Sequence, residues 1–337
     1  MRTINYILII FLTFYITVFS QKREINFYNN AKKIKTIKFD NSLLIGDITY
    51  LDTDINNNIL VTDMLSKKVY LFNSDGGLIK TLSTEKCTPG FNWQPYKAMF
   101  DRKGNIVVLN SAPWGYRFNA DGNCFGDMDI SFIAPAHLAF LENGSMVGYY
   151  NYGDGNHLKY MDNTGKEKFK FGKFPKDFER LIYRFEGGGL ITDNNDNIYQ
   201  VNVSSPLVTK YDKKGNFIKE FMNKPSYLRI IEKDLSNNDP VNALKEVPKL
   251  LENKTTTTAL FLYENNKILV LLSHSKYFGI ELYNTDGKYL LNKELILDKK
   301  ILAAKNGYIY LLLQPPLDKK GNLPNPVVEV YKLQSNK

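Results

Sequence analysis

The sequence predicts an all-β protein, a six-bladed β-propeller of four-stranded antiparallel blades whose ring is closed by an N-terminal strand. Two kinds of β-hairpin alternate along the 337 residues, and such regular repetition of short strands and turns is typical of radial repeat folds. Tyr and Phe are frequent, with 22 and 21 copies, which favours strands. A hydrophobic content of 43% indicates a packed globular protein.

The first hairpin type has a turn rich in Asp, Asn and Gly, followed by a strand with β-branched residues. These residue types tolerate the positive φ that tight turns require. The six copies read DTDINNNILVTD, DRKGNIVVLN, LENGSMVGYY, DNNDNIYQVN, ENNKILVLLS and AKNGYIYLLL.

The second hairpin type is represented by YLFNSDGGLIKTL, residues 70–82. Its turns contain Asp75-Gly76, Asp121-Gly122, Thr164-Gly165, Lys214-Gly215 and Asp286-Gly287. One hairpin of each type supplies four strands. We therefore expect complete blades at about 45–82, 95–128, 136–171, 187–221 and 258–295.

The C-terminal part of the chain supplies only three strands of a sixth blade, at about 299–304, 307–313 and 327–333. The segment KKIKTIKF, residues 32–39, alternates charged and apolar residues as an outer strand does. We expect this N-terminal strand to complete the last blade, because closing the ring pairs edges that would otherwise stay open.

Two stretches carry a family resemblance. PYKAMFDRKGNIVVLN followed by GYRFNADGN resembles an NHL repeat, and ITYLDTDINNNILVTDMLSKKVYLFNSDGG matches almost as well. The chain is thus similar to the exported six-bladed β-propellers common in bacteria. This resemblance implies the fold strongly and the function weakly, because such propellers host binding, scaffolding and several enzyme activities.

Residues 1–20 have the layout of a secretory signal peptide. Arg2 precedes an apolar run over residues 6–19, and Ser20 ends the segment. The run is shorter than the roughly 20 residues that span a bilayer. We expect a mature propeller at 21–337 that is exported and is periplasmic, at the cell surface or secreted. The alternative is an uncleaved anchor, which would be the only membrane contact.

Residues 228–258 do not fit the repeat and predict a small helical insertion between blades four and five. Leu244, Val247 and Leu250 follow a helical spacing, which Pro248 interrupts. The insertion either caps the side of the propeller or acts as a lid or partner contact.

The formal net charge of +9 does not indicate nucleic-acid binding. Lysines are scattered over strand ends and turns, as at Lys67, Lys68, Lys213 and Lys214, which is typical of a solvated surface. An exported protein also seldom meets nucleic acid. An anionic glycan or membrane surface stays open as a partner.

The two cysteines, Cys87 and Cys124, would be able to pair in an oxidising compartment. The repeat places Cys87 in an inter-blade loop and Cys124 just after a turn at the opposite end of a strand. We therefore expect two buried thiols, with a disulfide as the alternative.

No cofactor is expected, although calcium is an alternative. The three histidines are not at metal-ligand spacing. Asp52, Asp54, Asn56 and Asn58 have the alternating oxygens of a calcium loop, and Asp63 falls at the twelfth position. No turn glycine or flanking helix accompanies them, so we interpret this stretch as a hairpin turn.

Aromatic residues concentrate in loops that a propeller places on one face, namely the links between blades and the connections between second and third strands. Tyr and Trp combine large contact area with a polar group, which suits recognition of a protein or glycan. The candidate ligand-binding residues are Trp93, Trp114, Tyr149, Tyr150, Tyr152, Asp154, His274 and Tyr277. The alternative is that these side chains pack between neighbouring blades.

The predicted function is an exported binding or scaffold propeller that recognises a protein or glycan through this aromatic loop face. The chain has no G-x-S-x-G elbow and no glycine-rich phosphate loop before a helix. No catalytic residue or metal ligand is assigned, and an enzyme is the less favoured expectation. The alternative is a metal-dependent lactonase- or lyase-like enzyme with its site at the central channel.

Overall fold

The computed structural model describes residues 24–84, 87, 93–110, 114–129, 135–150, 155–173, 187–230, 254–274, 276–317, 319, 321 and 323–334. The predicted signal peptide and the expected helix of the insertion lie outside the described residues. In the part that the structure describes, no helix has both the length and the apolarity needed to cross a membrane.

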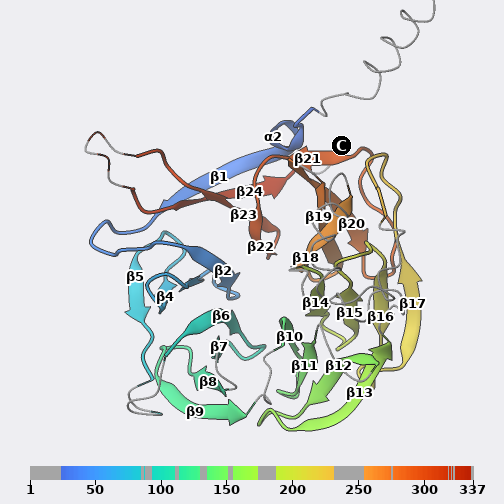
Figure 1. Ribbon diagram of the computed structural model, residues 1–337, viewed down its shortest axis with the longest axis horizontal. Coiled ribbons are helices and arrows are strands. Elements are labelled where there is room, and N and C mark those ends of the chain that lie inside the picture. Colours follow the sequence, from blue (N-terminus) through green and yellow to red (C-terminus); the bar gives the residue numbers. More distant parts are fainter. Residues whose placement is uncertain are drawn as a thin grey trace, which may run out of the picture.

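The predicted six-bladed propeller is confirmed: six four-stranded antiparallel sheets are arranged in a ring (Figure 1). Blade 1 contains β2 (Ile48–Thr53), β3 (Ile59–Asp63), β4 (Lys68–Phe72) and β5 (Leu78–Thr81). Blade 2 contains β6 (Pro95–Phe100), β7 (Ile106–Asn110), β8 (Trp114–Phe118) and β9 (Cys124–Asp129). Blade 3 contains β10 (His137–Phe140), β11 (Met146–Tyr149), β12 (Asn156–Met161) and β13 (Glu167–Lys173).

The remaining blades follow the same plan, from the inner strand outward. Blade 4 contains β14 (Gly189–Thr192), β15 (Ile198–Val201), β16 (Val208–Tyr211) and β17 (Phe217–Phe221). Blade 5 contains β18 (Thr255–Glu264), β19 (Lys267–His274), β20 (Tyr277–Asn284) and β21 (Leu295–Leu297). Blade 6 contains β22 (Ile301–Lys305), β23 (Tyr308–Leu313), β24 (Val327–Leu333) and, as its outer strand, β1 (Ala31–Lys38).

The expected closure of the ring by the N-terminal strand is also confirmed. β1 pairs antiparallel with β24, from Ala31 opposite Leu333 to Lys38 opposite Val327. Before it lies the short helix α2 (Phe27–Asn30), whose Phe27 is fully buried between blades 5 and 6. Both ends of the described chain are therefore fixed in the same sheet.

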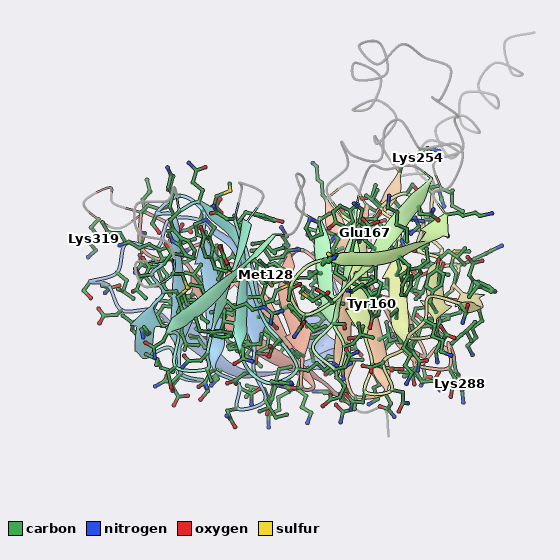
Figure 2. All side chains as sticks on the ribbon, turned by 90° about the horizontal axis from the view of Figure 1, so that it is seen from below. Met128, Tyr160, Glu167, Lys254, Lys288 and Lys319 are labelled. Carbon is green, nitrogen blue, oxygen red and sulfur yellow. A yellow bond between two sulfur atoms is a disulfide. The ribbon has the colours of Figure 1, made fainter. Side chains whose placement is uncertain are left out.

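The ring has two faces that differ in their connections. The loop face carries the links between blades and the connections between second and third strands; the turn face carries the other hairpin turns. Seen edge-on, Lys254 just before β18 lies toward one face, and Lys288 in the β20–β21 turn lies toward the other (Figure 2). The inner strands begin at the loop face and run toward the turn face.

Most turns on the turn face are held by an Asp or Asn side chain at the first turn position. In the β6–β7 turn, Asp101 Oδ1 accepts the backbone N–H groups of Lys103 and Asn105, both at 2.8 Å. The Asn105 side chain donates back to Asp101 Oδ2 at 3.0 Å. The same reciprocal Asp–Asn pair holds three further turns: Asp54–Asn58, Asp193–Asn197 and Asp212–Asn216. These side chains replace backbone partners that a tight turn lacks.

Outer strands twist far enough to reach the next blade. Lys80 Nζ, in β5, donates to Asn123 Oδ1 in the β8–β9 turn at 2.6 Å. Gly122 in that turn has a φ of 71°, and a Cβ there would meet the side chain of Leu82 at 2.7 Å. The same contact recurs as Ile37 on Gly76, Phe171 on Gly215 and Phe221 on Gly287. Turn glycines are thus required both by conformation and by the neighbouring side chain.

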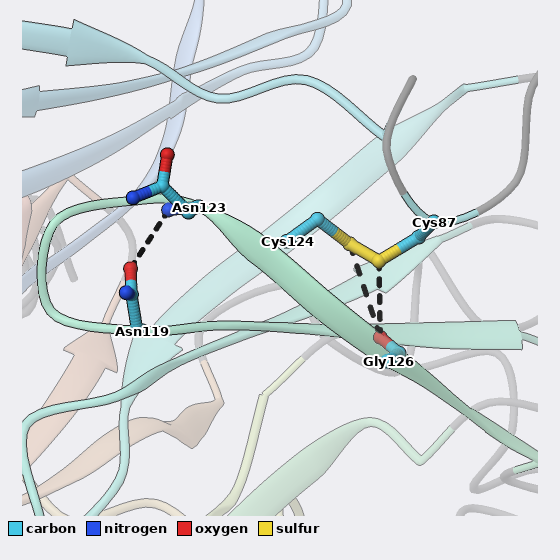
Figure 3. The surroundings of a disulfide bond; sticks show 5 residues. All are labelled: Cys87, Asn119, Asn123, Cys124 and Gly126. Carbon is cyan, nitrogen blue, oxygen red and sulfur yellow. Dashed lines mark hydrogen bonds between the residues drawn. A yellow bond between two sulfur atoms is a disulfide. The ribbon is translucent and has the colours of Figure 1, made fainter.

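The expectation of two free thiols was wrong, because Cys87 and Cys124 form a disulfide with a Cα–Cα distance of 5.8 Å (Figure 3). The prediction treated the strands as parallel to the propeller axis, which puts the cysteines at opposite ends of a blade. The twist instead brings the end of β5 beside the beginning of β9. The disulfide therefore fastens the β5–β6 link of blade 1 to the outer strand of blade 2.

We predict that the double variant Cys87→Ala, Cys124→Ala loses about 4 kcal/mol of unfolding free energy, because the disulfide closes a loop over a sequence separation of 37. Denaturant unfolding with and without a thiol reductant measures this loss. The reduced wild type should match the variant, and the variant should not respond to reductant. Equal stability of oxidised and reduced wild type would contradict the prediction.

Candidate functional site

The six inner strands surround the propeller axis (Figure 1), and each has one residue at a corresponding pairing position toward its loop-face end. These six residues are Tyr50, Lys97, His137, Gly189, Ala259 and Ala303. In β2, β6, β18 and β22 a register shift immediately precedes the residue. In β10 and β14 the residue pairs with the last residue of the second strand. At this level blades 1 to 3 have polar residues, whereas Ala259 and Ala303 pack in the clusters between blades and Gly189 lies against Leu260 of blade 5.

Lys97 is the most unusual of the three polar residues, because its side chain is buried with 8% of the residue exposed. Its Nζ donates to Ala136 O at 2.7 Å and lies 4.7 Å from the centroid of the Tyr50 ring. Among the described residues no carboxylate pairs with it; the charge that acts on it is a second cation, Lys300. Burial, and then repulsion by Lys300, lower the pKa of Lys97 to about 8.

His137 stands next to Lys97 on the following blade. Its Nε2 lies 3.1 Å from Gly187 O, and since a carbonyl only accepts, Nε2 carries the proton. Burial, and then the charge of Lys97, lower the pKa of His137 to about 3. The imidazole is therefore neutral at physiological pH, and its Nδ1 is a hydrogen-bond acceptor.

Tyr50 completes the polar half of this level. Burial, and then the carboxylate of Asp52, raise the pKa of the Tyr50 phenol above its usual value, so the hydroxyl group stays a donor. Lys300 precedes β22 and is exposed at the loop face. We call Tyr50, Lys97, His137 and Lys300 the axial cluster.

Toward the turn face, the polar groups near the axis are engaged in bonds between blades. Asp52 pairs with Lys305 of blade 6 at 2.9 Å and accepts the backbone N–H of Phe100 in blade 2 at 2.8 Å. Arg102 of blade 2 donates to Phe140 O of blade 3 at 3.1 Å and to Thr192 Oγ1 of blade 4 at 3.0 Å. This end of the axis is therefore closed by structural contacts.

The carboxylates of the possible calcium loop point to different places. Asp52 faces Lys305, and Asp54 binds the backbone of its own turn through Asn56 and Asn58. Asp63, at the other end of β3, accepts backbone N–H groups from Gly46 at 2.9 Å and Asp47 at 3.0 Å. Within the described residues, no group of three or more His, Cys, Asp or Glu side chains is arranged to hold a metal ion.

The predicted ligand-binding residues of blades 2 and 3 are placed as follows. Trp93 packs on Tyr116 and Phe118, with ring centroids 5.6 and 6.2 Å apart. Tyr149 and Tyr150 are buried, with 0% and 1% exposed. Trp114 begins β8, but its side chain is not described, and Tyr152 and Asp154 lie outside the described residues. Trp93 and Tyr149 thus pack in the clusters between blades 1 and 2 and between blades 3 and 4, respectively.

His274 and Tyr277 are brought together beside the β19–β20 turn of blade 5, with ring centroids 5.2 Å apart. Both approach Tyr227, which follows blade 4; the Tyr227–Tyr277 centroids are 5.9 Å apart. Tyr227 donates to Glu281 Oε1 at 3.4 Å. The structure therefore joins these two predicted residues to a buried acid that the sequence analysis did not select.

Glu281 is 1% exposed and also accepts a hydrogen bond from Asn223 Nδ2 at 2.9 Å. The pKa of Glu281 is raised to about 7. Burial is the largest cause and the charge of Glu294 adds to it, whereas the hydrogen bonds of Glu281 act in the opposite direction. Gly279 lies so close that a Cβ there would meet the Tyr227 hydroxyl at 1.8 Å. This acid fixes the segment after blade 4 against blade 5.

Lys97 and Glu281 share a feature that is visible in the sequence. Each interrupts an apolar strand, in PYKAMF and FGIELY respectively. A charge in a strand with apolar residues on both faces marks either a buried pair or a functional group.

Comparison with known proteins gives no family assignment. No protein-family model matches the chain, and no protein of curated function matches its sequence. Solved structures do match its fold. A presumed exported protein from Bacteroides fragilis NCTC 9343 gives a TM-score of 0.65 at 14% identity, over 91% of this chain and 96% of that chain.

Two further structures show the same fold. A member of the DUF4221 family from Bacteroides vulgatus ATCC 8482 gives a TM-score of 0.64 at 10% identity, covering 91% and 98% of the two chains. A catalytically inactive virginiamycin B lyase from Staphylococcus aureus, solved with quinupristin, gives 0.51 at 12% identity, covering 85% and 80%. At these identities the likeness supports the propeller fold alone and does not identify the NHL-repeat family.

We predict that Lys97→Met makes the protein more stable than wild type at pH 7, and that this advantage disappears as the pH rises from 8 to 10.5. The folded pKa of about 8 lies below the usual lysine pKa of 10.5, so the charged form of Lys97 destabilises the fold until it loses its proton. The pH-dependent difference should be about 3 kcal/mol. Chemical unfolding of both proteins across this range measures it, and a constant difference would contradict it.

Glu281→Gln should show the opposite dependence. The folded pKa of about 7 exceeds the usual glutamate pKa of 4.5, so protonated Glu281 stabilises the fold below pH 4.5, and this contribution is lost as the pH rises through 7. Wild type should lose about 3 kcal/mol relative to the variant over this range. Unfolding curves at pH 4.5 and pH 8 test the sign, and parallel pH profiles would refute it.

Proposed function

We propose that this protein is an exported, non-enzymatic binding propeller that docks a protein partner on its loop face, across blades 1 and 6. The observation that carries this proposal is a group of large aliphatic side chains that are between 53% and 83% exposed. They lie in the β1–β2, β3–β4 and β23–β24 connections: Leu44, Met64, Leu65, Leu317 and Leu323. We call these five residues the docking surface.

The three connections are bonded into one surface. Asn325, before β24, accepts the backbone N–H of Ile45 at 3.1 Å and donates to Leu43 O at 2.7 Å. Asp63 accepts the N–H groups of Gly46, in the β1–β2 connection, and Leu65, in the β3–β4 turn. The docking surface is thus held in shape before a partner arrives, which reduces the entropy lost on binding.

The chemistry of the docking surface favours a protein over a glycan. Glycan sites stack sugars on aromatic rings, whereas all five side chains here are aliphatic, and exposed aliphatic groups in neighbouring loops are typical of protein interfaces. Lys67, Lys68 and Lys319 are exposed in the same connections, and Lys319 lies at the left edge of the ring in Figure 2. A partner with acidic residues around an apolar centre would complement them.

Export rests on three supporting observations. The apolar segment at 6–19 has the layout of a secretory signal. The Cys87–Cys124 disulfide is the kind of cross-link that persists in oxidising compartments. A structural neighbour from Bacteroides fragilis is itself a presumed exported protein.

A metal-dependent lactonase or lyase at the axis is less well supported. The axial cluster places Lys97 and Lys300 near the axis, and two positive charges repel a divalent cation. The acid closest to this level, Asp52, is already paired with Lys305.

Site-specific photo-crosslinking in cells of the source organism tests the proposal. Leu317 and Phe217 are each 61% exposed, on blades 6 and 4 respectively, so a photoreactive residue at Phe217 is the matched control. We expect a discrete protein adduct from position 317 and none from 217, and Leu65→Asp should reduce the adduct about tenfold or more. Equal labelling at both positions, or an adduct insensitive to Leu65→Asp, would overturn the proposal.

A further inference from the structure

We propose that the axial cluster binds a small organic carboxylate through the Lys97 ammonium and the Tyr50 hydroxyl group. This site is separate from the docking surface, and neither proposal depends on the other. It lies at the loop-face end of the inner strands, where Lys300 is exposed.

The first argument is charge balance. A buried ammonium is stable when an anion or several hydrogen-bond acceptors surround it. Lys97 has one carbonyl acceptor, Ala136 O, and the nearby Lys300 adds a charge of the same sign. Among the described residues Asp52 offers no counter-charge, because Lys305 and the N–H of Phe100 occupy its oxygens. One buried positive charge matches one carboxylate.

The second argument is the arrangement of donors. The ammonium has three protons and gives one to Ala136 O, so protons remain for a carboxylate oxygen. The Tyr50 hydroxyl is a second donor, and the Tyr50 ring lies 4.7 Å from Nζ, so donor groups from blades 1 and 2 are close together. Neutral His137 adds an acceptor at Nδ1 for a hydroxyl or amide group of the same ligand.

The third argument is the closure of the axis at the opposite end. Toward the turn face, Arg102 donates to Thr192 Oγ1 and Asp52 pairs with Lys305. A carboxylate would therefore approach Lys97 from the loop-face end of the inner strands, where Lys300 is exposed.

A second lysine in the same protein serves as the matched control. Lys210 is also 8% exposed, lies 5.2 Å from the centroid of the Tyr199 ring, and donates to a backbone carbonyl, Thr285 O, at 3.1 Å. It differs in position and in charge environment: it is on the third strand of blade 4, and Tyr199 is bonded to Asp193 at 2.8 Å. Lys210→Met therefore removes a similar buried cation away from the axis.

Calorimetric titration at pH 7 and constant ionic strength tests the proposal, with acetate and benzoate as probes and phosphate and chloride as comparison anions. We expect the carboxylates to bind wild type more tightly than phosphate or chloride. Lys97→Met should weaken carboxylate binding about 10- to 100-fold, the range of a charge-assisted hydrogen bond. Lys210→Met should bind like wild type.

The results that overturn the proposal are distinct. Absence of carboxylate binding to wild type, equal affinity for all four anions, or equal weakening by both lysine substitutions would each refute it. If Lys97→Met does not fold, Tyr50→Phe and the pH profile of wild type replace it. Affinity should then fall several-fold without the Tyr50 hydroxyl and should decline as the pH rises past 8; unchanged values in both experiments would refute the site.

Discussion

Face-to-face packing of neighbouring blades is the interaction on which the rest of this structure depends. The buried apolar residues form six clusters, and each lies between two adjacent blades. Successive residues of one strand pack in clusters on opposite faces of the blade: Val107 packs toward blade 3 and Val108 toward blade 1. Both faces of the second strands β3, β7 and β15 are therefore buried, which explains why these strands are largely apolar runs, whereas the outer strands β5, β13 and β17 are largely exposed. A blade without its neighbours would expose both faces.

Most of the fold could be predicted from the sequence because each hairpin turn is determined by the residues within it. Asp101 and Asn105, or Gly122 with its positive φ, specify a turn with no reference to distant residues, and strand boundaries follow from the turns. The disulfide could not be predicted from the sequence, because the approach of Cys87 to Cys124 depends on the twist of whole blades. Twist is the sum of small rotations over a whole sheet, so no single residue of the sequence indicates it.

The candidate site was harder to predict for a related reason. Whether a residue faces a neighbouring blade or the axis depends on register shifts such as the one before Lys97. Such shifts cannot be predicted from the sequence. Tyr149 and Tyr150 were selected by loop position, but both turn inward. A charge within an apolar strand would have been the better indicator, since it marks Lys97 and Glu281, which the sequence analysis did not select. The loop face then combines an aliphatic rim at blades 1 and 6 with a cationic centre.

The pairing of β1 with β24 has a consequence for synthesis. The first strand of the chain is hydrogen-bonded to the last, with Ala31 opposite Leu333, so the ring cannot close until nearly the whole polypeptide has left the ribosome. Until then Val328, Val330 and their partners in β1 lack their final contacts. Such sequence-distant pairing slows folding. The sheet of blade 6 is therefore the last of the six to form.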